Sequence, residues 1–324
     1  MSTSITLQDI FTAQQTIQRI AHKTPLLRSE PLSAHLNVPV YLKLETMQDI
    51  GAFKIRGAAN KMLNLSSDDK ERGVVTASTG NHGRAVAYVA REIGLAATVC
   101  LSKHVPENKV AALRRLGAEV VIHGQSQDEA EVRAQELHET RGLVMIHPFD
   151  DADVIAGQGT IGLELLADLP DIDTVVVPLS GGGLIAGIAL ALKSANPAIR
   201  VVGVSMERAP AMYDSLQAGH PVQVDEEPTL ADSLQGGIGL ENRYTFRMAQ
   251  HYVDEVILVS EAEIAAAMAF TLREHRLVVE GGGAVGIAAV QTDKLSSPQG
   301  KTALVLSGGN VDLTQLLEIV QRYG

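Results

Sequence analysis

The spacing of apolar and polar positions changes along the chain, and the changes predict an alternating α/β fold. Residues 6–20 (TLQDIFTAQQTIQRI) open with a capping-box pattern from Thr6 to Asp9, and their apolar positions are compatible with one helical face. From residue 73 onwards, short β-branched runs alternate with helix-like segments. This alternation is typical of βαβ units, whose strands pair in parallel through right-handed crossovers.

The predicted strands fall into two series of near-continuous apolar runs, as expected when helices cover both faces of a sheet. They are residues 74–78, 96–102, 118–124 and 143–149, followed by 174–180, 200–206, 255–260 and 302–309. The sequence therefore predicts two doubly wound α/β domains with parallel sheets, and an active site in the cleft between them. Residues 220–242 are rich in Gly, Pro, Asp and Glu without clear periodicity, which indicates a long functional loop.

Composition restricts the classes of protein to which the chain can belong. The chain has 324 residues and a formal charge of -11, which argues against binding to nucleic acid or to an anionic membrane surface. The single cysteine, Cys100, lies in an apolar run, which predicts a core residue and fits a reducing compartment. The N-terminus lacks the pattern of a signal peptide, and no apolar run is long enough to span a bilayer. We therefore expect a cytoplasmic protein.

Small, hydroxylic and amide residues follow three of the predicted strands. These segments are STGNHG at residues 78–83, SGGG at 180–183 and SGGN at 307–310. Because ligands of doubly wound sheets bind at the carboxyl ends of the strands, the three segments are expected to line one pocket. A serine and three glycines before a helix expose backbone N–H groups that attract phosphate, although a tight turn could require the glycines for its dihedral angles alone.

Other motifs are absent or out of context. GQGTIG, residues 157–162, matches the dinucleotide fingerprint G-x-G-x-x-G, but it does not follow a strand, so a flavin- or nicotinamide-binding oxidoreductase is disfavoured. There is no Walker motif, no H-E-x-x-H and no closely spaced Cys/His cluster, so no metal site is predicted. His82 lies in the glycine-rich strand end, where a structural role competes with a functional one.

Lys54 lies between Phe53 and Ile55 in the stretch GAFKIRGAAN, residues 51–60. Most lysines with apolar neighbours run their stems along the surface and keep the ammonium in water. A lysine moved out of water has a lowered pKa, which suits it to act as a nucleophile or a base. Together with a phosphate loop and a strand end rich in Ser, Asn and His, it favours an aldehyde cofactor with a phosphate, such as pyridoxal phosphate.

FKIRGA, STGNHG, SGGG and SGGN occur in the order and spacing of the fold-type-II pyridoxal-phosphate enzymes. The chain resembles their serine/threonine dehydratase and serine racemase branch over nearly its whole length, including residues 154–164 and 278–290. The resemblance implies a tryptophan synthase β-like fold with a large cofactor domain (1–72 and 150–324) and a small mobile domain (73–149). It also implies a homodimeric lyase that removes the β-hydroxyl of a 3-hydroxy amino acid, giving a 2-oxo acid and ammonia.

The resemblance implies roles for individual residues. Lys54 matches the Schiff-base lysine and the base for the Cα proton, with Phe53 beside the cofactor ring. The cofactor-binding positions are Asn81 at the 3-hydroxyl, Ser307 at the pyridine nitrogen, Glu280 near the ring, and Ser180, Gly181, Gly182, Gly183 and Leu184 at the phosphate. The substrate carboxylate is expected at Ser78, Thr79, Asn81 and His82. Glu280 could alternatively cap the helix that follows it.

The chain departs from parts of the family pattern. Thr79 stands where serine racemases have a second catalytic serine, so we expect racemisation to be weak or absent. Ser205 and Ala211 replace carboxylates of the family's divalent-cation site, which leaves Glu207 and Asp214 out of register and a cation doubtful. No extra C-terminal regulatory domain is expected. Residues 204–222 and 230–246 also resemble the hydroxyectoine utilisation subgroup, which implies a hydroxyectoine-derived substrate.

Other functions on the same fold remain open from the sequence. They are an amino-acid racemase, a β-replacement enzyme of the cysteine synthase kind, and a catalytically silent regulatory protein that binds pyridoxal phosphate. The presence of Lys54, Ser78, Asn81 and His82 argues against the silent protein, which could lose these residues freely.

Overall fold

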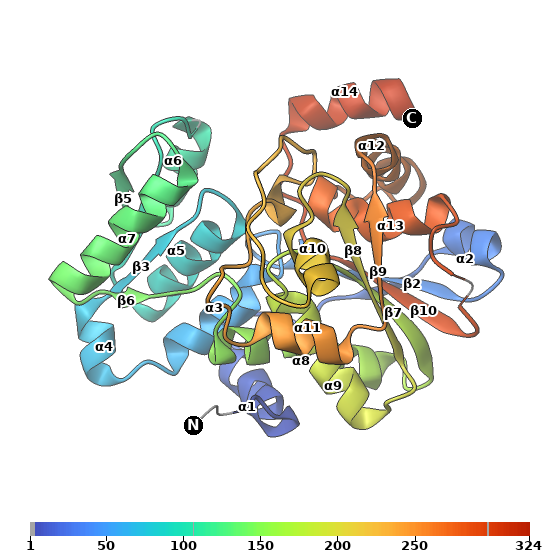
Figure 1. The fold of residues 1–324 in the computed structure, drawn as a ribbon, viewed down its shortest axis with the longest axis horizontal. Coiled ribbons are helices and arrows are strands. Elements are labelled where there is room, and N and C mark those ends of the chain that lie inside the picture. The colour runs from blue at the N-terminus through green and yellow to red at the C-terminus, as the bar shows by residue number, and fades with distance from the viewer. Residues whose placement is uncertain (1–3, 106, 297) are drawn as a thin grey trace.

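Two β-sheets with helices on both faces make up the computed structural model, which describes residues 4–105, 107–296 and 298–324 (Figure 1). The six-stranded sheet has the order β1 (Leu26–Arg28), β2 (Val40–Leu44), β10 (Lys301–Leu306), β7 (Ile172–Pro178), β8 (Arg200–Met206) and β9 (Glu255–Val259). The four-stranded sheet has the order β5 (Glu119–Ile122), β4 (Ala97–Leu101), β3 (Val74–Ala77) and β6 (Val144–Met145).

Helices cover both faces of the six-stranded sheet, which explains its unbroken apolar strands. One face packs against α2 (Glu30–Leu36), α12 (Glu261–Phe270), α13 (Gly281–Gln291) and α14 (Leu313–Tyr323). The other packs against α8 (Ala152–Asp168), α9 (Gly183–Ala195), α10 (Ala211–Ala218) and α11 (Thr245–Tyr252). Helix α1 (Leu7–Ile17) lies against α8 and α9, and its predicted capping box is confirmed because Thr6 and Asp9 bond to each other's backbone N–H.

The four-stranded sheet is covered in the same way. Helices α5 (Asn81–Ile93) and α6 (Glu107–Arg115) lie on one face and α7 (Gln127–Arg141) on the other. Cys100 of β4 is buried in this core, as predicted, and burial raises the pKa of its thiol to about 11. The remaining short helices are α3 (Lys54–Leu63), α4 (Ser67–Arg72), η1 (Glu45–Met47), η2 (Asp232–Leu234) and the π-helical turn η3 (Thr271–His275).

The predicted doubly wound α/β class is confirmed, with corrections in detail. All eight predicted strands are present, but β1 and β2 were not predicted, and β1 is antiparallel to β2. The predicted strand at 143–149 is too long, since β6 is only Val144–Met145. Pro148 has no N–H for a ladder, and the ring of His147 accepts hydrogen bonds from the N–H groups of Phe149 and Asp150, which turns the chain.

The division into domains stays a prediction. The four strands β3 to β6 fall within residues 73–149, in agreement with the expected small domain. One buried cluster, however, crosses the expected boundary at residue 73: Ile55, Ala59 and Met62 of α3 pack with Val86 and Val89 of α5. Helix α3 therefore contacts both parts of the molecule.

GQGTIG lies inside helix α8, and this explains its glycines without a nucleotide. A Cβ on Gly157 would lie 2.5 Å from the carbonyl oxygen of Arg56 in α3. A Cβ on Gly187 of α9 would lie 2.3 Å from the carbonyl oxygen of Ile155 in α8. The glycines therefore let three helix backbones approach more closely than side chains would allow.

We expect Gly187→Ala to lower the free energy of unfolding by about 1–3 kcal/mol, because the added methyl group meets a backbone carbonyl that cannot rotate away. The matched control is Gly286→Ala in α13, where the nearest atom to an added Cβ is 3.4 Å away. That variant is expected to be neutral or to stabilise the protein by up to about 1 kcal/mol, since alanine favours a helix. Urea unfolding measures both, and equal stabilities of the two variants would contradict the close approach.

Candidate active site

A short backbone pairing places the lysine helix beside the end of β10. Phe53 N–H donates to Ser307 O at 3.0 Å and Gly309 N–H donates to Gly51 O at 2.9 Å, with an antiparallel bridge between Ala52 and Gly308. Helix α3 begins at the next residue, Lys54. The pairing therefore brings two segments that are far apart in sequence, FKIRGA and SGGN, to the carboxyl end of the same sheet.

The amine of Lys54 points into the protein. Its Nζ donates a 2.7 Å hydrogen bond to the backbone carbonyl of Pro148 and lies 5.3 Å from the ring centroid of Phe53. Burial lowers the pKa of Lys54 to about 8, and no carboxylate contributes to the shift. This is the environment of a nucleophile or base rather than that of a surface lysine.

The glycine loop lies against the residue that follows Pro148. A Cβ on Gly181 would lie 2.3 Å from the Phe149 ring, and one on Gly183 would lie 2.8 Å from the Phe149 carbonyl oxygen. Gly182 has φ +88°, which disfavours other residues. Both the turn and the packing therefore need glycine. The glycine content of SGGG alone does not distinguish a phosphate-binding loop from a tight turn.

The helix that starts at the glycine loop favours an anion there. Gly182 is the N-cap of α9 and provides no side-chain acceptor for the N–H groups of the first turn, which begins at Gly183 and Leu184. Ser180 precedes them and is half-buried. Backbone N–H groups and the helix dipole make such a start a binding site for phosphate.

A second uncapped helix start lies in the loop after β3. Gly80 is the N-cap of α5 and has no side chain to bond the first amides of the helix, while Ser78 and Thr79 before it are half-buried. A Cβ on Gly83 would lie 2.2 Å from the carbonyl oxygen of Ser78, so the helix starts directly against the strand end. This site suits a second anion, such as a carboxylate.

Three polar residues from separate segments form a buried network. Asn81 Nδ2 donates to Glu280 Oε1 at 2.7 Å, Asn310 N–H donates to Glu280 Oε2 at 3.0 Å, and Asn310 Nδ2 donates to Asn81 Oδ1 at 2.7 Å. Glu280 is the N-cap residue of α13, but its side chain makes no capping bond, so the alternative capping role is not observed. Burial raises the pKa of Glu280, which favours its protonated form more than in water.

His82 makes a structural contact. Its Nε2 lies 2.9 Å from the carbonyl oxygen of Ile146, next to β6, and the side chain is buried. Burial and the nearby charge of Lys54 lower the pKa of His82 to about 3, so the ring is neutral. The ring therefore holds α5 against β6, and only its neutral form is present to contact a substrate.

Ser307 offers an unused hydroxyl. The residue is 3% exposed, and its hydroxyl makes no hydrogen bond within the parts of the chain that the structure describes. The hydroxyl lies just after the carboxyl end of β10 and is available to a ligand atom there. The site thus combines a primary amine, an uncapped helix start and a free hydroxyl, which fits the aldehyde, phosphate and ring nitrogen of pyridoxal phosphate.

Several residues of the site were not identified from the sequence. The sequence predicts a strand that includes Pro148 and Phe149, but these residues contact Lys54 and the glycine loop. The sequence marks Asn310 only as the end of SGGN. In the structure, Arg84 Nη1 donates to it at 2.6 Å, and it bonds both Asn81 and Glu280. The dipeptide His-Pro at the end of an apolar run was the available signal for a turn.

Two further features bear on possible ligands. Within residues 4–105, 107–296 and 298–324, no three His, Cys, Asp or Glu side chains gather in a geometry suited to a metal ion. Glu207 instead pairs with Lys294 at 3.4 Å. No helix in the same ranges has the length and apolarity needed to cross a membrane.

Comparison with known proteins shows the family to which the chain is similar. Residues 17–308 match the family model described as pyridoxal-phosphate dependent enzyme. An L-threonine ammonia-lyase of Thermotoga maritima is 45% identical over 318 residues, which cover 98% of this chain and 79% of that protein.

Solved structures are similar over nearly the full length. Maize serine racemase has a TM-score of 0.92 at 35% identity, covering 98% of this chain and 97% of its own. The processed form of threonine deaminase isoform 2 from Solanum lycopersicum has a TM-score of 0.90 at 38% identity, covering 97% and 86%. From its fold, its site and these relatives, the chain belongs to the fold-type-II pyridoxal-phosphate-dependent enzymes, in the branch of serine and threonine dehydratases, which are ammonia-lyases.

Proposed function

We propose that this lyase removes the β-hydroxyl of L-threonine, L-serine or a closely related 3-hydroxy amino acid, giving a 2-oxo acid and ammonia. The observation that carries the proposal is the half-buried amine of Lys54, held by Pro148 O next to the residue that packs on the glycine loop. The names of relatives support the substrate class, since they include L-threonine ammonia-lyase and threonine deaminase.

The chain's own groups suit each part of the cofactor. Bound pyridoxal phosphate supplies an aldehyde for the substrate's amino group and a ring that withdraws electrons from Cα. The first turn of α9, at Gly183 and Leu184, would hold the phosphate, and the Ser307 hydroxyl would face the ring nitrogen. A hydroxyl there leaves the ring less firmly protonated than a carboxylate would, which favours prompt loss of the β-hydroxyl.

Lys54 is suited to move the Cα proton. With a pKa of about 8, its amine is neutral in about a tenth of molecules at pH 7, far more than an ordinary lysine, and the neutral amine can accept a proton at Nζ. The start of α5, with Ser78 and Thr79, would hold the substrate carboxylate. The β-hydroxyl would leave Cβ as water with the proton that Lys54 Nζ took from Cα, and water would later release ammonia from the product. Closure of residues 73–149 over the substrate would exclude bulk water from these steps.

Replacement of the lysine tests the proposal directly. We expect Lys54→Ala to lose the near-visible absorbance of covalently bound pyridoxal phosphate and to lose turnover together, because no other group forms that bond. The control is Lys301→Ala, at the opposite end of β10, where Nζ pairs with Asp171 at 2.7 Å; it should keep both. Spectra and parallel assays of 2-oxo acid and ammonia with threonine and serine measure the outcome. Retention of both properties by Lys54→Ala would refute the proposal.

The same assay separates the alternatives. Preference for a hydroxyectoine-derived β-hydroxy diamino acid as substrate would support the subgroup resemblance. No turnover of that compound by protein that turns over threonine would refute a hydroxyectoine-derived substrate. Added thiol that is retained in the product would indicate β-replacement, and a cofactor spectrum without turnover of any candidate would indicate a silent protein. That the protein is a cytoplasmic homodimer stays a prediction. Sedimentation of the purified protein tests its oligomeric state.

The buried amine should also make stability depend on pH. The pKa of Lys54 falls from its ordinary value of 10.5 to about 8 on folding, so the unfolded chain binds the proton more tightly. The loss of folding stability caused by burying the ammonium is complete below pH 8 and disappears as pH rises to 10.5. We expect Lys54→Met to raise the free energy of unfolding of cofactor-free protein by about 1–3 kcal/mol at pH 7 and by much less at pH 10. Urea unfolding at both pH values measures this, and an equal difference at both would contradict it.

Thr79 is expected to limit racemisation. Its hydroxyl is retained, but the added methyl group and the stiffness of χ1 restrict it as an acid on the second face of the ring. We expect little D-serine from L-serine in the native chain, and a several-fold increase relative to elimination in Thr79→Ser. Chiral chromatography of timed reactions measures the ratio. Native racemisation at the rate of elimination would contradict this role for Thr79.

A further inference from the structure

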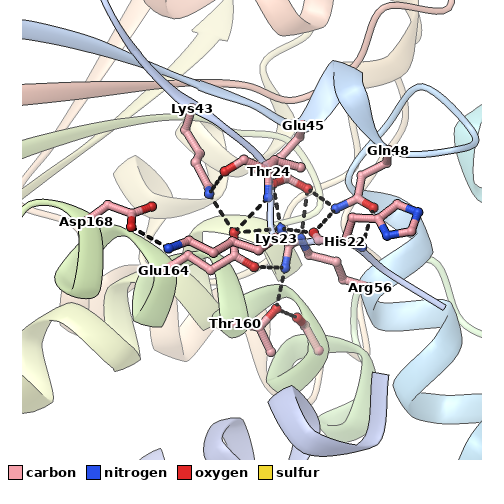
Figure 2. Close-up of polar contacts among 11 residues, drawn as sticks. His22, Lys23, Thr24, Lys43, Glu45, Gln48, Arg56, Thr160, Glu164 and Asp168 are labelled. Atoms are coloured by element: carbon pink, nitrogen blue, oxygen red, sulfur yellow. Dashed lines mark hydrogen bonds and ion pairs between the residues drawn. The ribbon is translucent and has the colours of Figure 1, made fainter. Parts of the chain in front are cut away.

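Four buried charged side chains, one of them Arg56 of helix α3, meet in one cluster (Figure 2). Arg56 is 1% exposed, Lys43 and Glu45 are 0% exposed, and Glu164 is 6% exposed. Arg56 follows Lys54 by two residues on α3, so the two side chains project from nearly opposite faces of the helix. Lys54 points towards Pro148, whose neighbour Phe149 packs on the glycine loop, while Arg56 points into the core.

The guanidinium of Arg56 binds two carboxylates in a forked geometry. Its Nε and Nη2 donate to the two oxygens of Glu45, each at 2.8 Å. Its Nη1 and Nη2 donate to the two oxygens of Glu164 at 2.6 and 3.0 Å. Glu45 begins η1, directly after β2, and Glu164 lies on α8, so the forks fix α3 to the sheet and to a neighbouring helix.

The other polar groups of the cluster are also satisfied. Lys43 Nζ donates to Glu164 Oε2 at 2.5 Å and to Thr24 O at 2.7 Å. Thr24 Oγ1 donates to Glu45 Oε1 at 2.6 Å, and Arg56 Nη1 donates to Thr160 Oγ1 at 3.0 Å. The two positive groups, Lys43 and Arg56, balance the two negative groups, Glu45 and Glu164. Figure 2 also draws the neighbouring Lys23–Asp168 ion pair.

Stability alone is a weak explanation for such a cluster. Burying four charges costs desolvation free energy, and well-packed apolar side chains of similar volume are often as stabilising. What apolar groups cannot supply is direction, because a fork fixes the rotation and the axial position of a helix. A helix whose first residue must reach a defined point gains from that restraint.

Helix α8 connects this restraint to the glycine loop. It crosses α3 at Gly57 and Gly157, next to the Arg56–Glu164 pair, and it crosses α9 where a Cβ on Gly187 would lie 2.6 Å from Gly159 N. Helix α9 starts at Gly183, one turn before that crossing. GQGTIG thus lies on the element that sets the separation between the lysine and the proposed phosphate site.

We propose that Arg56, through its forks to Glu45 and Glu164, is a positioning residue that holds the amine of Lys54 at a fixed place relative to the glycine loop. The proposal rests on the proposed role of Lys54 as the residue that binds the cofactor covalently. The burial of the Lys54 amine depends on the same restraint.

The decisive variant removes the directional hydrogen bonds of the Arg56 forks but leaves no unpaired buried charge. Lys43→Met, Glu45→Leu, Arg56→Met and Glu164→Leu combined give an apolar cluster that is expected to fold with little change in thermal midpoint. We expect its apparent affinity for pyridoxal phosphate, followed by absorbance, to fall at least about tenfold, since small displacements of a reactive group have large effects. In the cofactor-free protein, acetylation of Lys54 measured against pH by mass spectrometry should shift towards an ordinary lysine profile.

The outcomes distinguish this inference from the proposed function. Borohydride trapping followed by peptide mapping must first place the cofactor on Lys54 in the native chain, and failure there would overturn the function itself. The positioning role alone would be overturned by a different result. In that case the native chain traps the cofactor on Lys54, while the folded fourfold variant keeps the native affinity for pyridoxal phosphate and the native acetylation profile of Lys54.

A second variant decides the question if the fourfold variant does not fold. Arg56→Lys keeps the charge but replaces the fork with a single ammonium, so it should lower cofactor affinity and move the acetylation profile. The control for general destabilisation is Leu316→Ala in the core under α14. It should lower the thermal midpoint without moving either readout. The inference would be overturned if Arg56→Lys, like this control, changed neither the cofactor affinity nor the Lys54 acetylation profile.

Discussion

The pairing of residues 51–53 with residues 307–309 is the interaction on which the site depends. Two backbone hydrogen bonds and one bridge place the start of α3 at the carboxyl end of β10. Because backbone groups make these contacts, they fix the direction in which Lys54 leaves the sheet and do not depend on flexible side chains. The glycines of SGGN are needed there, since a Cβ on Gly308 would lie 2.6 Å from Glu280 Oε1.

Around this pairing the protein keeps opposite chemistry on the two faces of α3. The face towards the glycine loop holds a lysine whose ammonium is disfavoured, because burial is the only cause of its lowered pKa. The opposite face holds Arg56, whose charge is fully matched by Glu45 and Glu164. One helix thus carries a cation that is left without a counterion, which makes it reactive, and a cation that is fully paired, which makes it rigid.

Helix starts rather than charged side chains would supply the proposed anion sites. The first turns of α5 and α9 both begin after a glycine that has no side chain to cap them. Both follow strands, β3 and β7, so the two sites come from different sheets. A ligand with two anionic ends, such as the cofactor joined to an amino acid, would span them. Movement of one sheet relative to the other would then change the distance between the two ends.

The sequence alone determined the alternation of strands and helices, the phosphate-loop pattern and the unusual context of Lys54, because periodicity and glycine spacing are local properties. It did not reveal β1 and β2, which are short and whose place in the sheet depends on pairing with β10, nor the turn at His147 and Pro148. Only the tertiary structure showed that Glu280 faces Asn81 and not its own helix, and that Arg56 joins Glu45 to Glu164. These contacts join residues distant in sequence, and no local pattern specifies which partner a buried polar group will meet.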